Sequence, residues 1–341
     1  MQAPEAGRAV ATDVARAAGV SQKTVSRVVN RDPNVSAATR RRVEAAITAL
    51  GYRPNAAARA LVTQRSRVLG VAMPGSVDYG PSAQLFAIES TAWELGYSVV
   101  VASAVASAVA SSADFERAIG RLVDQGVDGL ILANPYVDQG LSADVLRGVP
   151  AVNVGEATGP AGWPTVTVDQ EMGARLAVEH LLALGHRTVH HLAGPATQGA
   201  AVRRVHGWRR ALSGAGREVP EPLLGDWTAR SGYELGRVLA RDPAVTAVFA
   251  ANDQMAVGVM RAVLEAGRRV PEDVSVVGFD DSPDAGYQVI PLTTVRQEFA
   301  DGARRAVTGL VAAVEGRGGG DGATVRMPVE LVVRSSTGPA P

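Results

Sequence analysis

Short apolar segments alternate with longer amphipathic segments from residue 67 almost to the C-terminus, and this alternation constrains the fold most. Strands are expected at residues 68–73, 98–102, 129–132, 151–154, 165–168, 188–192, 247–250 and 274–278. Helices are expected at residues 82–95, 114–125, 170–184, 202–213, 231–241 and 254–266. Such alternation is typical of parallel sheets covered by helices on both faces. Two runs of it predict an α/β body of two doubly wound parallel-sheet subdomains with a ligand cleft between them.

Composition limits the classes of function. The 341 residues contain 46% hydrophobic and 20% charged side chains, which is ordinary for a globular protein and argues against disordered or fibrous classes. Without cysteine the chain can form no disulfide, no thiolate zinc site and no cysteine nucleophile. The first 19 residues lack the apolar core of a signal peptide, and no stretch is apolar enough to span a membrane. We therefore expect a cytoplasmic protein without a membrane partner.

Charge is distributed unevenly along the chain. Residues 1–67 hold twelve basic and four acidic side chains, a net charge of +8, and the remaining residues carry −8. A compact basic segment favours a polyanionic partner such as DNA, because clustered cations release counterions from the phosphates. A solvated basic tail is the alternative interpretation.

Three helices are expected within the basic segment, at residues 11–18, 22–30 and 37–50. Ser21 and Ser36 are good N-caps for the second and third helix, and Gly51 ends the third. Two helices joined by a short glycine-containing turn form the helix-turn-helix layout. The outward face of the second helix consists of Ser21, Gln22, Lys23, Ser26, Arg27 and Asn30. Side chains of these types contact base edges and phosphates in the major groove of double-stranded DNA.

The order of residues in this segment is more specific than its spacing. It contains Thr-Asp-Val-Ala at 12–15, Ala-Gly-Val-Ser at 18–21, Thr-Val-Ser-Arg-Val-Val-Asn at 24–30 and Gly-Tyr-Arg-Pro-Asn at 51–55. These motifs closely resemble the DNA-binding head of the LacI/GalR repressor family. The resemblance implies that residues 1–54 bind operator DNA. The resemblance also implies that five further residues contact DNA: Thr12, Ser36, Thr39, Tyr52 and Asn55.

A short segment follows this head. Asn55 can cap a helix at residues 56–61, which is too short to be stable alone in water. The resemblance implies a hinge helix, within residues 55–66, that folds on DNA and inserts Leu61 into the minor groove as a wedge. Ala58 would let two hinge helices approach each other. An unstructured linker is the alternative.

The rest of the chain resembles the same family. Its motifs are Gly-His-Arg at 185–187, Leu-Ala-Gly-Pro at 192–195, Gly-Asp-Trp at 225–227, Ala-Asn-Asp-Gln-Met-Ala at 251–256 and Val-Gly-Phe-Asp-Asp at 277–281. The resemblance implies an effector-binding and dimerisation domain at 67–341 with the fold of periplasmic sugar-binding proteins. The chain would cross between subdomains near Thr167, Arg296 and Arg326. One subdomain would comprise 67–167 with 297–325, and the other 168–296 with 326–341.

Catalytic and metal-binding motifs are not evident. Lys23 is the sole lysine, which excludes a Gly-Lys-Ser/Thr phosphate loop, and no Gly-x-Ser-x-Gly elbow occurs. Four histidines, at 180, 186, 190 and 191, are close in sequence, but the last two would point to opposite faces of one strand. We expect structural roles for them, no metal or cofactor, and no enzymatic activity.

Polar residues follow two of the expected strands. Asn252 and Asp253 come after the strand at 247–250, and Phe279, Asp280 and Asp281 come after the strand at 274–278. Open parallel sheets bind ligands at this edge, where amides and carboxylates suit sugar hydroxyls and an aromatic face suits their C–H surface. Helix capping is the alternative role of Asn252 and Asp280. The resemblance implies an effector site formed by Arg204, Trp227, Asn252, Asp280 and Phe299.

These observations predict a homodimeric transcriptional repressor that a small sugar releases from operator DNA, with a galactoside as one candidate. The C-terminal end lacks the leucine heptads that make some family members tetramers. The chain departs from the family pattern near Gly155 and at residues 75–79, so a purine or phosphosugar effector, or a corepressor, stays open. A sugar-binding protein of a transport system and a sugar-processing enzyme are the alternatives of other classes.

Overall fold

The structure is a computed structural model of the chain, and it describes residues 9–29, 32–52, 65–75, 78–104, 112–133, 141–155, 162–318 and 322–341. The chain divides into two compact units, the head (Met1–Ser66) and the body (Arg67–Pro341). Four residues with predicted roles in DNA binding lie outside the described residues: Asn30, Asn55, Ala58 and Leu61. Within the described ranges, no helix is both long and apolar enough to cross a membrane.

The described part of the head folds into the helices α1 (Ala11–Ala18), α2 (Gln22–Val29) and α3 (Ala37–Ala49). They enclose a small core of valine and alanine side chains, composed of Val14, Ala15, Ala18, Val25, Val28, Val43 and Ala46. The predicted helix-turn-helix layout, with a third helix packed against it, is therefore present.

Local hydrogen bonds define where these helices start. Ser21 Oγ accepts a hydrogen bond from the backbone N–H of Thr24 (3.1 Å), and Ser36 Oγ accepts one from that of Thr39 (3.3 Å). Each serine thus satisfies a backbone donor that the first turn of a helix leaves unpaired. Gly19 ends α1 with a φ of 62°, a backbone conformation that glycine adopts without steric strain.

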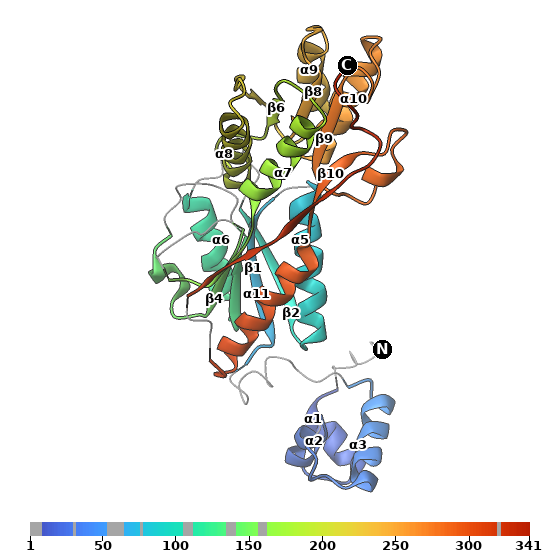
Figure 1. The fold of residues 1–341 in the computed structure, drawn as a ribbon. Coiled ribbons are helices and arrows are strands. Elements are labelled where there is room, and N and C mark those ends of the chain that lie inside the picture. The colour runs from blue at the N-terminus through green and yellow to red at the C-terminus, as the bar shows by residue number, and fades with distance from the viewer. Residues whose placement is uncertain are drawn as a thin grey trace, which may run out of the picture. The chain divides into compact units, whose positions relative to one another are not determined.

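The first sheet of the body has the strand order β11-β5-β4-β3-β1-β2, and its neighbouring strands are parallel. Its strands are β1 (Val68–Pro74), β2 (Ser98–Ala104), β3 (Gly129–Leu132), β4 (Ala151–Val154), β5 (Thr165–Val168) and β11 (Thr324–Met327). One face packs on α5 (Tyr79–Glu94) and α11 (Phe299–Val314), which contact each other (Figure 1). The other face packs on α6 (Ser112–Asp124) and the short 3-10 helix η1 (Ala143–Leu146).

The second sheet has the strand order β12-β10-β9-β8-β6-β7. Its strands are β6 (His190–Ala193), β7 (Leu223–Leu224), β8 (Ala247–Ala250), β9 (Ser275–Asp280), β10 (Thr293–Gln297) and β12 (Val329–Val332). Strand β12 is antiparallel to β10, and the other pairs are parallel. The pair α7 (Gln170–Ala183) and α8 (Gly199–Gly214) contributes to one core, and α9 (Ala229–Leu239) and α10 (Asp253–Glu265) to the other, with η2 (Ala285–Tyr287) nearby.

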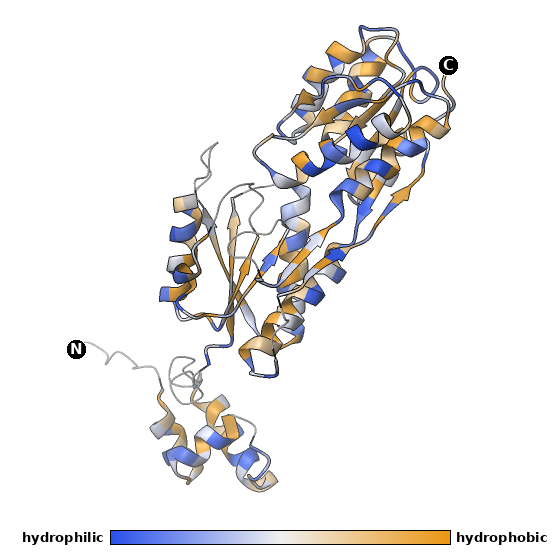
Figure 2. Cartoon of the chain, turned by 60° about the vertical axis from the view of Figure 1, so that its left-hand side comes forward, coloured by the Kyte–Doolittle hydropathy of each residue, from blue (hydrophilic) through white to orange (hydrophobic). Residues whose placement is uncertain are grey.

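The chain passes between the two sheets after β5, after β10 and after β11, close to the predicted crossings. The third passage is a single extended C-terminal segment that runs from β11 in one sheet to β12 in the other (Figure 1). Apolar residues dominate the strands, and hydrophilic residues lie over the outer faces of the helices (Figure 2). The predicted α/β class with two parallel-sheet subdomains is confirmed, and the exact subdomain limits stay a prediction.

Candidate functional site

A cavity lies between the carboxyl ends of the strands of the two sheets. The described residues that line it include the five predicted for the effector site, Arg204, Trp227, Asn252, Asp280 and Phe299. Each comes from a different place: α8, the loop before α9, the N-cap of α10, the last residue of β9 and the first residue of α11. The parallel topology brings them together because strands that run in the same direction end at the same edge.

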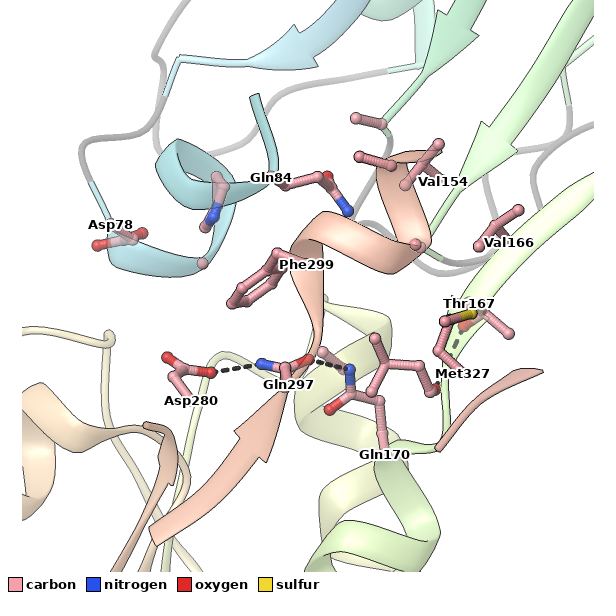
Figure 3. A pocket seen from close by; sticks show the side chains of 18 of the residues that line it. Asp78, Gln84, Val154, Val166, Thr167, Gln170, Asp280, Gln297, Phe299 and Met327 are labelled. Atoms are coloured by element: carbon pink, nitrogen blue, oxygen red, sulfur yellow. Dashed lines mark hydrogen bonds between the residues drawn. The ribbon is translucent and has the colours of Figure 1, made fainter. Parts of the chain in front are cut away.

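Four buried side chains form a closed ring of polar contacts in this cavity. Arg204 Nε donates to Gln170 Oε1 (2.8 Å), Gln170 Nε2 to Gln297 Oε1 (3.1 Å), and Gln297 Nε2 to Asp280 Oδ1 (2.5 Å). Arg204 Nη2 lies 3.7 Å from Asp280 Oδ1 and closes the ring. Figure 3 shows the part of the ring from Asp280 to Gln170. The two glutamines, which the sequence did not reveal, lie at the first and second passages of the chain between the sheets.

Arg204 is held from several sides. Its guanidinium stacks 3.6 Å from the ring centroid of Phe279 and 5.6 Å from that of Trp227, and it donates a hydrogen bond to the carbonyl of Ala251. Phe279 is fully buried beneath the arginine. The expectation that the aromatic face at 279 packs on a sugar is therefore wrong, because the guanidinium covers this face.

Burial shifts the ionisation of the charged pair. Desolvation lowers the pKa of Arg204 to about 10, against the opposing effect of Asp280 and Asp253, so the guanidinium stays charged at neutral pH. Desolvation raises the pKa of Asp280 to about 7, although Arg204 and the Gln297 hydrogen bond favour its charged form. The protonated form of this carboxyl can donate a hydrogen bond, whereas the charged form can only accept one.

Asn252 has the capping role that the sequence left open, and it also lines the cavity. Its Oδ1 accepts a hydrogen bond from Met255 N (2.9 Å) at the start of α10. Its Nδ2 donates to the carbonyl of Trp227 (2.9 Å) and to Gln254 Oε1 (2.9 Å). One lone pair of Oδ1 thus remains for a ligand. The amide also holds the Trp227 loop, where φ is 74°.

Two aromatic side chains shape the walls. The Trp227 indole covers Gly194, where an added Cβ atom would lie 2.3 Å from the ring, and Nε1 donates to Gln198 Oε1 (2.9 Å). Phe299 meets Tyr79 edge to face, with the ring centroids 6.0 Å apart. Figure 3 places Phe299 between the polar ring and Gln84 of α5.

The lining is acidic on balance and apolar on one side. Among its described residues, three carboxylates, Asp78, Asp280 and Glu298, face one cation, Arg204. The apolar lining comes mainly from the first sheet and α11 and comprises Met73, Val154, Val166, Val168, Ala303 and Met327. Helix α5 begins three residues earlier than predicted, and its first turn therefore contributes lining residues that the sequence did not indicate.

The head presents the predicted polar face on α2. Ser21, Gln22, Lys23 and Ser26 are exposed, whereas Arg27 is half buried and donates from Nε to Asp32 Oδ2 (2.7 Å). Of the other predicted DNA-contacting residues, Thr12 is exposed on α1, and Ser36 and Thr39 form the cap of α3. Tyr52 is partly buried against the core of the head. The predicted DNA contacts of α2 and of the start of α3 stay predictions.

The clustered histidines have mainly structural contacts. His180 Nε2 is hydrogen-bonded to Thr337 Oγ1 (2.9 Å), and His186 Nδ1 and Nε2 to Thr246 Oγ1 (2.9 Å) and Ser275 Oγ (3.1 Å). In the described part of the chain, no group of three histidine, aspartate or glutamate side chains is arranged to hold a metal ion.

Comparison with known proteins identifies both units. Residues 11–55 match the model of bacterial regulatory proteins of the lacI family, and residues 178–337 match a periplasmic binding protein-like domain. The chain is 39% identical to the lactose operon repressor of Escherichia coli K12, over 95% of this chain and 89% of that repressor. It is also 39% identical to the transcriptional regulator CelR of Thermobifida fusca, over 83% of this chain and 85% of the regulator.

Solved structures show the same similarity. The lac repressor dimer bound to operator and the anti-inducer ONPF has a TM-score of 0.85 at 37% identity, covering 97% of this chain and 99% of that one. A CelR–cellobiose complex has a TM-score of 0.69 at 34% identity, covering 96% and 100%. The chain therefore belongs to the lacI family of bacterial regulatory proteins, DNA-binding transcriptional regulators in which a helix-turn-helix head precedes a periplasmic binding protein-like body.

Proposed function

We propose that this regulator represses transcription as a homodimer on operator DNA and that a neutral sugar in the cavity controls it. The buried ring of Arg204, Gln170, Gln297 and Asp280 carries the proposal. It offers donors and acceptors in fixed positions, and the Trp227 ring lies beside it. Fixed polar groups next to an aromatic face suit the hydroxyl and C–H surfaces of a pyranose.

The charge of the cavity favours a neutral effector over a phosphosugar. Among the described lining residues, three carboxylates stand against one arginine, and Asp280 and Gln170 already contact that arginine. A phosphate group would bring further negative charge near these carboxylates in a desolvated site, where repulsion is weakly screened. The apolar side of the cavity fits the C–H face of a second sugar unit or an apolar aglycone.

The relatives support a sugar effector without selecting one. They include repressors named for the lactose and ribose operons and a CelR complex with cellobiose. A galactoside stays a candidate because of the similarity to the lactose operon repressor. Transcriptional repressors named PurR from two bacteria are also related, at 32% identity. The purine alternative stays open, so nucleobases belong in the test. A solute-binding role in transport would leave the basic head without a use.

A homodimer follows from the proposed operator binding, because a two-fold protein matches a palindromic DNA site. The lac repressor structure that resembles this chain is a dimer on operator. Exposed apolar side chains in both halves of the body are available for self-association, among them Phe86, Trp93, Tyr287 and Val289. Since operator DNA is the proposed partner, we place the protein in the cytoplasm.

A ligand screen by thermal shift tests the proposed effector class. Galactosides, glucosides, ribose and cellobiose are compared with sugar phosphates and purine bases on the wild type and on Arg204→Met. A ligand at a hundred times its Kd stabilises the folded protein by about 2.7 kcal/mol. We expect a neutral sugar to raise the Tm of the wild type alone. Stabilisation by phosphosugars or purines, and by no neutral sugar, would reject the proposed class.

A further inference from the structure

We propose that Asp281, which does not contact the cavity, positions Asp280 in it through an ion-pair clamp with Arg296 and Arg334. The proposal rests on the proposed function, in which Asp280 binds the effector. Asp281 is not among the described residues that line the cavity. The proposal gives it an indirect role in effector binding, through the position of Asp280.

The two aspartates occupy an unusual stretch of backbone. Their φ angles are 118° for Asp280 and 51° for Asp281, and residues other than glycine rarely adopt positive values. The Asp280 carboxylate lies in the cavity with Gln297 and Arg204. Because backbone of this kind is unfavourable by itself, contacts elsewhere must hold it in place.

Asp281 supplies such contacts through both of its carboxylate oxygens. Arg296 Nε donates to Oδ2 (2.7 Å) and Arg334 Nη2 donates to Oδ1 (2.6 Å). The Asp281 side chain is 8% exposed, so water screens these charges poorly. Arg334 also donates from Nη1 to the carbonyl of Leu292 (2.7 Å), which fixes its own position. The orientation of residue 281 is thus set from two sides.

The clamp is built on the strands that join the two sheets. Arg296 precedes Gln297 on β10, immediately before the second passage, and Arg334 follows β12, the strand that completes the third passage. Gln297 therefore holds Asp280 from inside the cavity while its neighbour Arg296 holds Asp281 from outside. One strand end contacts both members of the pair, so the clamp links the position of the effector-binding carboxylate to the strands between the subdomains.

Two variants separate the clamp from its alternatives. Asp281→Asn keeps the volume and the tolerance for positive φ but removes the charge. Asp281→Gly relieves any backbone strain at 281 and removes the clamp. Asp273→Asn is the matched control, because Asp273 forms a similar two-oxygen pair with Arg269 just before β9, at the opposite end of the strand. Asp280→Asn serves as the reference for the proposed effector site.

The affinity of the full-length variants for ONPG and cellobiose is measured by calorimetry, with the Tm as a check of folding. We expect both Asp281 variants to bind at least tenfold more weakly than the wild type, and the Asp273 control to stay within twofold. Crystals without sugar give a readout that needs no probe. There we expect the Asp280 carboxylate to leave Gln297 and Arg204 in the Asp281→Asn variant and to remain in the control.

The outcomes are distinguishable. Wild-type affinity in Asp281→Gly would mean that position 281 needs only a left-handed backbone conformation. Wild-type affinity in Asp281→Asn would mean that the charge of Asp281 does not position Asp280. Either result overturns the clamp. Unchanged affinity in Asp280→Asn would instead overturn the proposed effector site. If the wild type binds neither probe, an unmoved Asp280 in the crystals of Asp281→Asn overturns the proposal, and a displaced one supports it.

Discussion

His191 lies fully buried in β6, stacked on Phe249 with ring centroids 4.7 Å apart and 5.3 Å from Trp208. Its Nδ1 is hydrogen-bonded to the carbonyl of Phe249 (2.9 Å), and within the described residues Nε2 has no hydrogen-bond partner. Burial lowers its pKa from 6.5 to about 4. The unfolded chain therefore binds a proton below pH 6.5 that the folded protein accepts only near pH 4.

This difference predicts acid sensitivity that His191→Leu removes. As the pH falls from 6.5 to 4, the wild type loses about 3 kcal/mol of its free energy of unfolding at this residue. The leucine variant has no titrating group here. The free energy of unfolding of the variant minus that of the wild type should therefore be larger at pH 5 than at pH 8. Urea unfolding at both values checks this, with the exposed His206→Leu as control. Parallel pH dependence in His191→Leu and the wild type would contradict it.

Arg27 on α2 is oriented by its ion pair with Asp32, and its predicted base contact can be tested by substitution. If it contacts a base, Arg27→Ala should weaken operator binding by about 1–3 kcal/mol more than binding to random duplex. Fluorescence anisotropy on both duplexes measures the difference. Asp32→Ala is the companion variant, which frees the guanidinium without removing it and should cost less. Equal losses on operator and random DNA would reduce Arg27 to a phosphate contact.

At the scale of elements, α5 has apolar residues on two faces. Ala87, Ile88 and Ala92 are buried against the first sheet, whereas Phe86 and Trp93 are 74% and 77% exposed. The exposed pair is seven residues apart and therefore lies on one side of the helix. Two large aromatic side chains exposed on one side of a helix favour this side of α5 as the interface of the proposed homodimer.

Phe86→Glu should therefore convert the proposed dimer to a monomer at micromolar concentration, because a carboxylate does not tolerate burial in an apolar interface. Light scattering measures the mass, and operator titration should show a loss of affinity with it. Val238→Glu on α9, another exposed apolar position, is the control and should remain dimeric. A dimeric Phe86→Glu variant would place the interface elsewhere.

At the scale of the whole molecule, the cavity belongs to the body and the helix-turn-helix to the head, which are separate compact units. Control of one by the other is thus a coupling between two binding equilibria. An effector that weakens operator binding by some factor must itself bind the operator complex more weakly by the same factor. Such couplings are typically about 1–3 kcal/mol.

Asp280→Asn tests this coupling. The residue lies in the body, so the variant should bind operator with wild-type affinity but no longer respond to the sugar that releases the wild type. Operator titrations with and without that sugar, and sugar titrations with and without operator, should give the same coupling factor for the wild type. Loss of operator binding in the variant would mean that Asp280 acts on the fold rather than on the effector.

Much of this arrangement follows from local patterns. The serine caps, the glycine turn and the valine spacing predict the head helices. Alternation of apolar strands with helices predicts β1 to β6, β8 and β9, but the expected strands do not include β7, β10, β11 or β12. The position of Asn252 and Asp280 at strand ends predicts a shared location, since parallel strands end at one edge. Where prediction failed, as at the starts of α5 and α8, the missed turns lie on the cavity, where Gly80 and Ala200 contribute to its lining.

The periodicities, the caps and the charge of the head can be inferred without a structure, because they depend on residues a few positions apart. The folded chain is needed to show that Gln170 and Gln297, 127 positions apart, bond to each other and complete a ring with Arg204 and Asp280. It also shows that Phe279 supports an arginine rather than a ligand. Burial, the cause of the shifted pKa values, and the chain passages that bring these side chains together arise from contacts between distant segments, which no local pattern encodes.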